Sequence, residues 1–166
     1  MHPTAGWQIR QSFERDRAAL DDFHERTWGG SIVVAHDEAF DLRTLPAFVA
    51  FGDDGALAGA LSWRVADDAL EVVSIAAATP GDGIGTALLR AVVAEATASG
   101  VRRIWLVTSN DNLRALRFYQ RRGLRIVGVD PGAVDRARRM KPSIPTIGAD
   151  GIPVHDEIRL ELVLDS

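Results

Sequence analysis

Residues 80–89 constrain the fold more than any other segment, because three glycines stand there at a change of hydrophobic period. Residues 70–77 form an apolar run typical of a buried strand, whereas residues 83–98 repeat apolar side chains at helical spacing. Glycines at such a junction allow a tight turn and leave main-chain N–H groups free beside the positive end of a helix dipole. The segment predicts a phosphate or pyrophosphate site, with a glycine turn that binds no ligand as the alternative.

Two common phosphate-binding motifs do not match this segment. A dinucleotide-binding fingerprint needs a third glycine, but Ala87 and Leu88 stand there. A Walker-type loop needs Gly-Lys-Ser/Thr, which does not follow.

The other periodicities predict a mixed α/β sheet in a single domain, residues 1–166. Short polar turns between apolar runs indicate an antiparallel meander, after which helix and strand patterns alternate. The predicted strands are 6–10, 47–52, 56–65, 70–77, 101–107, 124–129 and 154–164, and the predicted helices are 13–26, 83–98 and 112–121. Residues 32–45 are ambiguous and are expected to hold a short second helix. Residues 131–153, with three Gly and four Pro, are expected to form an irregular insertion.

The composition argues against several classes of protein. The chain has 166 residues and no cysteine, which excludes disulfides, zinc sites built on cysteine and a cysteine nucleophile. No spacing of His, Asp and Glu indicates a metal site, and no apolar run approaches the roughly 20 residues of a membrane span. The first six residues lack the features of a signal peptide. We therefore expect a cytoplasmic protein with no metal and no membrane contact.

Charge is distributed unevenly along the chain. The net charge is −4, which does not favour a nucleic-acid partner, yet residues 101–141 alone carry a net +8. This asymmetry indicates either an anionic ligand near the middle of the chain or solvated helix faces.

Two motifs together identify a family. The first is the strand sequence EVVSIA at 71–76 followed by the glycine loop, Ala87, Leu88 and a helix. The second, within 112–124, reads Asn-x-x-Ala, then an aromatic residue with Tyr119, then glycine. Both motifs, and the order of predicted elements over residues 6–130, resemble the GNAT superfamily of N-acetyltransferases.

The resemblance implies acetyl-CoA as co-substrate and gives roles to particular residues. The backbone of the glycine loop would bind the CoA pyrophosphate, the strand edge the pantetheine arm, and Asn112 would contact CoA. Tyr119 would protonate the leaving thiolate, and Glu71 would be the general base. The implied cofactor-binding residues are Ser74, Ile75, Ala76, Ala77, Gly81, Asp82, Gly83, Ile84, Gly85, Thr86, Asn112 and Tyr119.

The sequence departs from the family pattern in the glycine loop. Pro80 stands where Arg or Gln is usual, and Asp82 where a cation is common. Asp82 either caps the following helix or weakens phosphate binding.

The two implied catalytic residues also have structural interpretations. Tyr119 is the only tyrosine, and a phenol with a pKa near 10 is protonated and able to act as an acid at neutral pH. Its alternative is a tyrosine packed on the core. Glu71 is alternatively an edge charge facing solvent.

Other segments are weaker candidates for the acceptor site. Residues 36–38 and the pair Asp156 and Glu157 are each able to contact an amine, and Trp28 is either a core aromatic or a wall of a substrate pocket. The Lys-Pro-x-Ile-Pro element at 141–145 is similar to a GNAT subgroup. It is interpreted as a lid, a clamp for the CoA 3′-phosphate, an acceptor contact or a solvated loop.

We expect an acetyltransferase that moves an acetyl group from acetyl-CoA to a primary amine by direct attack in a ternary complex. The alternatives are a non-catalytic domain that binds acyl-CoA and, less favoured, an RNA- or protein-binding module using the basic stretch. The acceptor stays open between a small molecule and a peptide amine, and a homodimer is one expected assembly.

Overall fold

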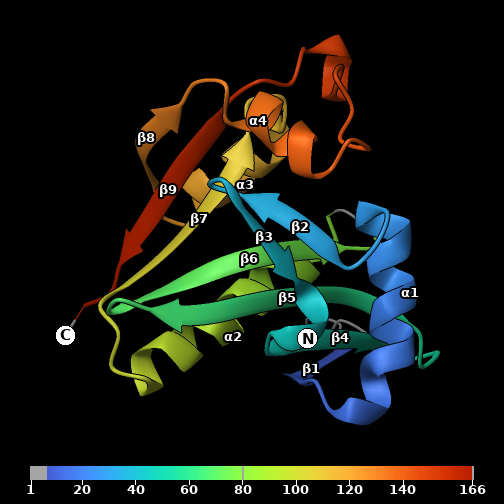
Figure 1. Cartoon of the computed structure of the whole chain (residues 1–166). Coiled ribbons are helices and arrows are strands. Elements are labelled where there is room, and N and C mark those ends of the chain that lie inside the picture. Colours follow the sequence, from blue (N-terminus) through green and yellow to red (C-terminus); the bar gives the residue numbers. More distant parts are fainter. Residues whose placement is uncertain (1–6, 80, 166) are drawn as a thin grey trace.

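A seven-stranded sheet forms the centre of the chain in a computed structural model that describes residues 7–79 and 81–165 (Figure 1). The strand order is β1-β4-β5-β6-β7-β9-β8, and a separate hairpin pairs β2 with β3. The strands of the main sheet are β1 (Trp7–Gln11), β4 (Ala47–Gly52), β5 (Leu57–Ala66), β6 (Ala69–Ala77), β7 (Arg103–Ser109), β8 (Arg125–Asp130) and β9 (Glu157–Val163). The hairpin consists of β2 (Ile32–Ala35) and β3 (Glu38–Asp41), and the helices are α1 (Arg17–Trp28), α2 (Ile84–Ala98), α3 (Leu113–Arg121) and α4 (Ala133–Met140).

Alternation along β4 and β5 places α1 and α2 on opposite faces of the sheet. Val49 and Ala60 pack in a cluster with Phe23 of α1. Their neighbours Ala50 and Leu61 belong to the cluster that contains the apolar side of α2. Because successive strand residues point to opposite faces, each strand contributes to both layers.

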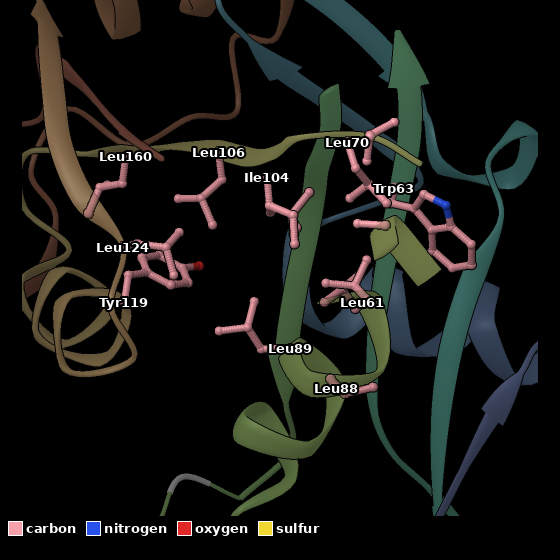
Figure 2. Close-up of a cluster of buried hydrophobic side chains, with 14 of the residues drawn as sticks. Leu61, Trp63, Leu70, Leu88, Leu89, Ile104, Leu106, Tyr119, Leu124 and Leu160 are labelled. Atoms are coloured by element: carbon pink, nitrogen blue, oxygen red, sulfur yellow. The ribbon is translucent and has the colours of Figure 1, made fainter. Parts of the chain in front are cut away.

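The larger core lies between the sheet and the helices α2 and α3. Figure 2 shows Leu61 of β5 near Leu88 of α2, and Leu70 of β6 and Ile104 of β7 belong to the same cluster. Tyr119 of α3 is part of this cluster. The core therefore fixes α2 and α3 relative to the strands that precede them.

The expected mixed α/β sheet and its antiparallel meander are confirmed. The helix after the glycine loop and the helix that follows Asn112 are confirmed as α2 and α3. The first predicted strand is observed as β1, and the Gly6 end of the prediction lies outside the described residues. Within the described ranges, no helix is long and apolar enough to cross a membrane.

The short second helix expected within 32–45 is wrong, because this stretch forms the β2–β3 hairpin and then one 3-10 turn, Leu42–Thr44. The β-branched residues at 32–34 favour a strand. The connecting residues His36 and Asp37 both have positive φ, at 40° and 64°, as a two-residue hairpin turn requires.

The insertion at 131–153 is not irregular throughout, because it contains α4. Gly132 starts this helix with a φ of 79°, and Val134 and Ala137 on one of its faces are buried. A helix of eight residues is too short for the spacing of its apolar residues to be recognised in a segment so rich in proline and glycine.

Gly59 in β5 lets α2 approach the sheet closely. A Cβ atom at this position would lie 2.6 Å from Cγ2 of Ile84 and 3.3 Å from Cδ1 of Leu88. Both side chains are buried on α2, so an added methyl group would force helix and sheet apart.

We therefore expect Gly59→Ala to lower the free energy of unfolding by about 1–3 kcal/mol, because it overpacks this contact. Gly128→Ala is the matched control, since Gly128 also lies in a strand but has no neighbour within 4 Å of an added Cβ. Urea denaturation of both variants measures the difference. Equal stability of the two variants would contradict this account of the packing.

Candidate active site

The sheet splits between β6 and β7, and the two cavities of the site lie at the split. These parallel strands pair only from Ala69 to Glu71 against Arg103 to Trp105. Beyond that point β6 and β7 diverge as they run on (Figure 1). The diverging ends expose main-chain groups of β6 that no strand of the described chain pairs on that side.

The first cavity, called the loop cavity, has a volume of about 390 Å³ and lies against the glycine loop. The second, called the strand cavity, has a volume of about 340 Å³ and lies between the diverging strands, under α4 and the hairpin. Four residues line both cavities: Ile75, Asn112, Ala115 and Tyr119. The two cavities therefore meet along the side of α3 that carries Asn112, Ala115 and Tyr119.

The glycine loop turns the chain from β6 into α2 at the loop cavity. Gly81 and Gly83 adopt left-handed φ values of 89° and 88°, a region that disfavours other residues. Gly85 is close to α3, because a Cβ there would lie 3.1 Å from the ring of Phe118. The main-chain amides at the start of α2 are thus next to the cavity, where they favour an anion.

Asp82 lies within this loop as a partial cap of the helix. Its Oδ1 accepts a hydrogen bond from the amide of Ile84 at 3.3 Å. Gly83 is the N-cap residue of α2, so Asp82 contacts the helix from one residue before the cap, and its side chain also lines the cavity. Pro80, the other departure from the family pattern, lies outside the described residues.

Basic side chains of α3 and the residue that follows it face the loop cavity. Arg122 donates a hydrogen bond from Nε to Oγ1 of Thr86 at 2.9 Å, and its guanidinium lies 3.9 Å from the centre of the Phe118 ring. Arg114 also lines the cavity. Our sequence reasoning missed Arg114, Phe118 and Arg122, although their four-residue spacing marks one face of a helix.

The predicted cofactor-binding residues gather at the loop cavity with two exceptions. Ser74 lines the strand cavity instead, and Ile84 points into the core with 1% of its surface exposed. The described residues that line the loop cavity from the predicted set are Ile75, Ala76, Ala77, Gly81, Asp82, Gly83, Gly85, Thr86, Asn112 and Tyr119.

Tyr119 is buried where the two cavities meet, and its ring lies next to Leu124 (Figure 2). Burial raises the pKa of its hydroxyl well above the usual value near 10. The hydroxyl therefore stays protonated and is available as a hydrogen-bond donor at physiological pH. Asn112 caps α3, because its Oδ1 accepts from the amide of Ala115 at 3.3 Å.

Glu71 is buried at the point where the strands separate, with both carboxylate oxygens engaged. Nε of Arg64 donates to one oxygen at 2.8 Å, and Nε2 of His36 lies 2.7 Å from the other. This hydrogen bond is the main reason why the pKa of His36 is raised. The described residues lining the two cavities do not include Glu71. Its contacts suit an internal anchor for the hairpin.

The strand cavity combines apolar walls with three charged side chains, Asp111, Lys141 and Glu157. Lys141 donates hydrogen bonds from Nζ to the carbonyls of Trp28 and Ile32, each at 2.8 Å, and burial lowers its pKa. The 141–145 element thus closes one side of this cavity. Trp28 lines the cavity and is 37% exposed, so it is a wall rather than a core aromatic.

No group of three or more His, Cys, Asp or Glu residues suited to a metal ion occurs in the part of the chain that the structure describes.

Comparison with known proteins agrees with this geometry. Residues 7–124 match the model of the acetyltransferase (GNAT) family. The chain is 36% identical over 146 residues to the uncharacterized protein YdhI of Bacillus subtilis, covering 88% of this chain and 91% of that protein. It is also 36% identical over 100 residues to a streptothricin acetyltransferase of Streptomyces lavendulae. This match covers 58% of this chain and 51% of that protein.

A solved Bacillus subtilis acetyltransferase in complex with CoA has the same fold, with a TM-score of 0.70 and 22% identity over 96% of this chain and 99% of that one. The family match spans both motifs and the split between β6 and β7. The chain belongs to the GNAT family of acetyltransferases.

Proposed function

We propose that this protein transfers the acetyl group of acetyl-CoA to a primary amine that is bound at the same time. The observation that carries the proposal is the meeting of the two cavities at Tyr119 and Asn112. One cavity suits the phosphates and pantetheine of CoA, and the other leaves space for the acceptor between mostly apolar walls. A thioester placed where they meet is accessible from both sides.

Three features support a CoA site in the loop cavity. The amides at the start of α2 and the basic residues Arg114 and Arg122 both favour phosphate groups. The unpaired edge of β6 beyond Glu71 offers main-chain hydrogen bonds to the pantetheine arm. The relative crystallised with CoA has this fold.

The transfer would proceed by direct attack of the neutral amine on the thioester carbon. A main-chain amide of β6 would stabilise the oxyanion of the tetrahedral intermediate. Collapse of this intermediate breaks the C–S bond and leaves the electron pair on sulfur.

Tyr119 would donate a hydrogen bond to the departing sulfur. The raised pKa of its hydroxyl exceeds that of a thiol, about 8.5, so complete transfer of the phenolic proton is unfavourable. Its contribution to the reaction is then the hydrogen bond, which stabilises the thiolate until an amine proton reaches sulfur. This narrows the role of proton donor that the family resemblance implies.

A negative charge in the glycine loop tests the CoA site. We expect Gly83→Asp to weaken acetyl-CoA binding by about 100-fold, because the carboxylate repels the pyrophosphate at the helix start. Gly55→Asp is the matched control, since Gly55 also has a positive φ, 79°, in a turn that lines neither cavity. Titration calorimetry measures the dissociation constants. Equal acetyl-CoA affinity of the two variants would place the cofactor elsewhere.

Removal of the Tyr119 hydroxyl tests the chemical step. We expect Tyr119→Phe to reduce kcat by about 100-fold while the dissociation constant for acetyl-CoA stays within twofold of the wild-type value. The ring that packs in the core is retained, so thermal unfolding serves as the control for folding. An unchanged kcat at saturating amine would remove Tyr119 from the reaction.

A further inference from the structure

Glu157 is a buried carboxylate on the wall of the strand cavity. It begins β9, lies opposite Ser109 of β7 and is 7% exposed. Both of its carboxylate oxygens accept from a single donor, the main-chain amide of His36, at 3.1 and 3.2 Å. The turn of the hairpin thus contacts the start of β9, next to the C-terminal end of β7 (Figure 1).

Glu157 differs from the other buried carboxylates in having no cationic partner. Asp16 is paired with Arg10 at 2.6 Å, and Glu71 with Arg64 at 2.8 Å. None of the ion pairs formed among residues 7–79 and 81–165 includes Glu157. A buried carboxylate with no ion-pair contact is unfavourable for folding, so a cationic ligand would gain affinity by pairing with it.

The other charged groups of the strand cavity already have partners. Lys141 is held by two carbonyls, and Asp111 accepts hydrogen bonds from the hydroxyl of Ser109 and the amide of Ala149. The remaining walls are mostly apolar and include Trp28. Neither carboxylate of the cavity is part of an ion pair, but Asp111 has two hydrogen-bond donors, whereas Glu157 is more deeply buried and has one. Glu157 is therefore the carboxylate of this cavity that gains most from a cation, and the surface around it suits an apolar body.

We propose that Glu157 binds the ammonium group of the acceptor and takes its proton, so that the acceptor class is a primary alkylamine carried on an apolar body. This inference rests on the proposed function and assigns the acceptor end of the same site. It also moves the role of general base from Glu71, whose oxygens are engaged with Arg64 and His36, to Glu157.

The proton and electron balance of the reaction is complete with this assignment. The ammonium group gives one proton to Glu157, and the amine lone pair then forms the C–N bond with the thioester carbon. The C–S bond breaks, its electron pair goes to sulfur, and a second proton from nitrogen ends on sulfur. The products are the acetamide and the CoA thiol, and Glu157 releases its proton to solvent.

The charges around Glu157 suit a proton acceptor. Burial raises its pKa, and Asp37 of the hairpin turn and Asp130 of β8 raise it further. The amide and charge of His36 oppose this rise. Arg136 of α4 is paired with both Asp37 and Asp130, at 2.8 and 2.7 Å. Because the pKa is raised, the carboxylate is lost as pH falls through this value, and amine binding should weaken with it.

Equilibrium binding of 2-phenylethylamine and its neutral isostere 2-phenylethanol tests the inference without any acetyl transfer. We expect the wild-type protein to bind the amine at least about 10-fold more tightly than the alcohol, measured by calorimetry at neutral pH. Glu157→Gln should abolish this preference. Glu161→Gln, which removes a carboxylate from the same strand but one paired with Arg159 at 3.0 Å, should keep it.

A kinetic experiment with 2-phenylethylamine and acetyl-CoA completes the test. We expect Glu157→Gln to lower kcat/KM for the amine by about 100-fold or more, with acetyl-CoA affinity within twofold of wild type. The preference of the wild type for the amine over the alcohol should weaken at acidic pH, and Glu157→Gln should show no such change.

The outcomes separate this inference from the proposed function. A wild-type protein that binds amine and alcohol equally, or a Glu157→Gln variant that keeps the amine preference, overturns the role of Glu157 even where acetyl-CoA binds. An amine preference that depends on Glu157 supports the acceptor site, whether or not the protein binds acetyl-CoA. Failure of the wild-type protein to bind acetyl-CoA would overturn the proposed function.

Discussion

The early separation of β6 from β7 is the constraint on which both cavities depend. The two parallel strands pair over three residues each and then diverge within one continuous sheet. At the point of separation, Glu71 holds Arg64 and His36, and the His36 ring packs 5.0 Å from the ring of Trp105 on β7. These contacts hold the β2–β3 hairpin at the separation point. The main-chain amide of His36 in the hairpin in turn donates to Glu157, so one hydrogen-bonded network connects the split to the strand cavity.

Much of the basic charge between residues 101 and 141 serves internal contacts. Arg136 is paired with Asp37 and Asp130, which ties α4 to the hairpin and to β8. Arg138 donates hydrogen bonds to the carbonyls of Ile144, Pro145 and Val154, which organise the chain after α4. Arg114 and Arg122 face the loop cavity, where an anion is expected. The basic residues between 101 and 141 therefore include arginines that hold the insertion together and arginines that line the loop cavity.

The sequence predicts the parts of this structure that depend on local period and on short motifs. The meander, the helix after the glycine loop and the position of Tyr119 at the end of an Arg-rich helix all follow from the order of residues. The hairpin at 32–41 was missed because its turn depends on two non-glycine residues with positive φ, which no local pattern marks. The different environments of Glu71 and Glu157 were not predictable either. They depend on contacts with His36, which is 121 residues from Glu157 and 35 residues from Glu71 in the sequence.

We propose that the acetyl donor and the amine occupy the two adjoining cavities at the same time. Initial-velocity kinetics with acetyl-CoA and 2-phenylethylamine, each varied at several fixed concentrations of the other, tests it most directly. The account predicts double-reciprocal lines that intersect, because both substrates must be bound before the acetyl group moves. Parallel lines would show that acetyl is transferred to the protein before the amine binds, and would contradict direct transfer at the meeting point of the two cavities.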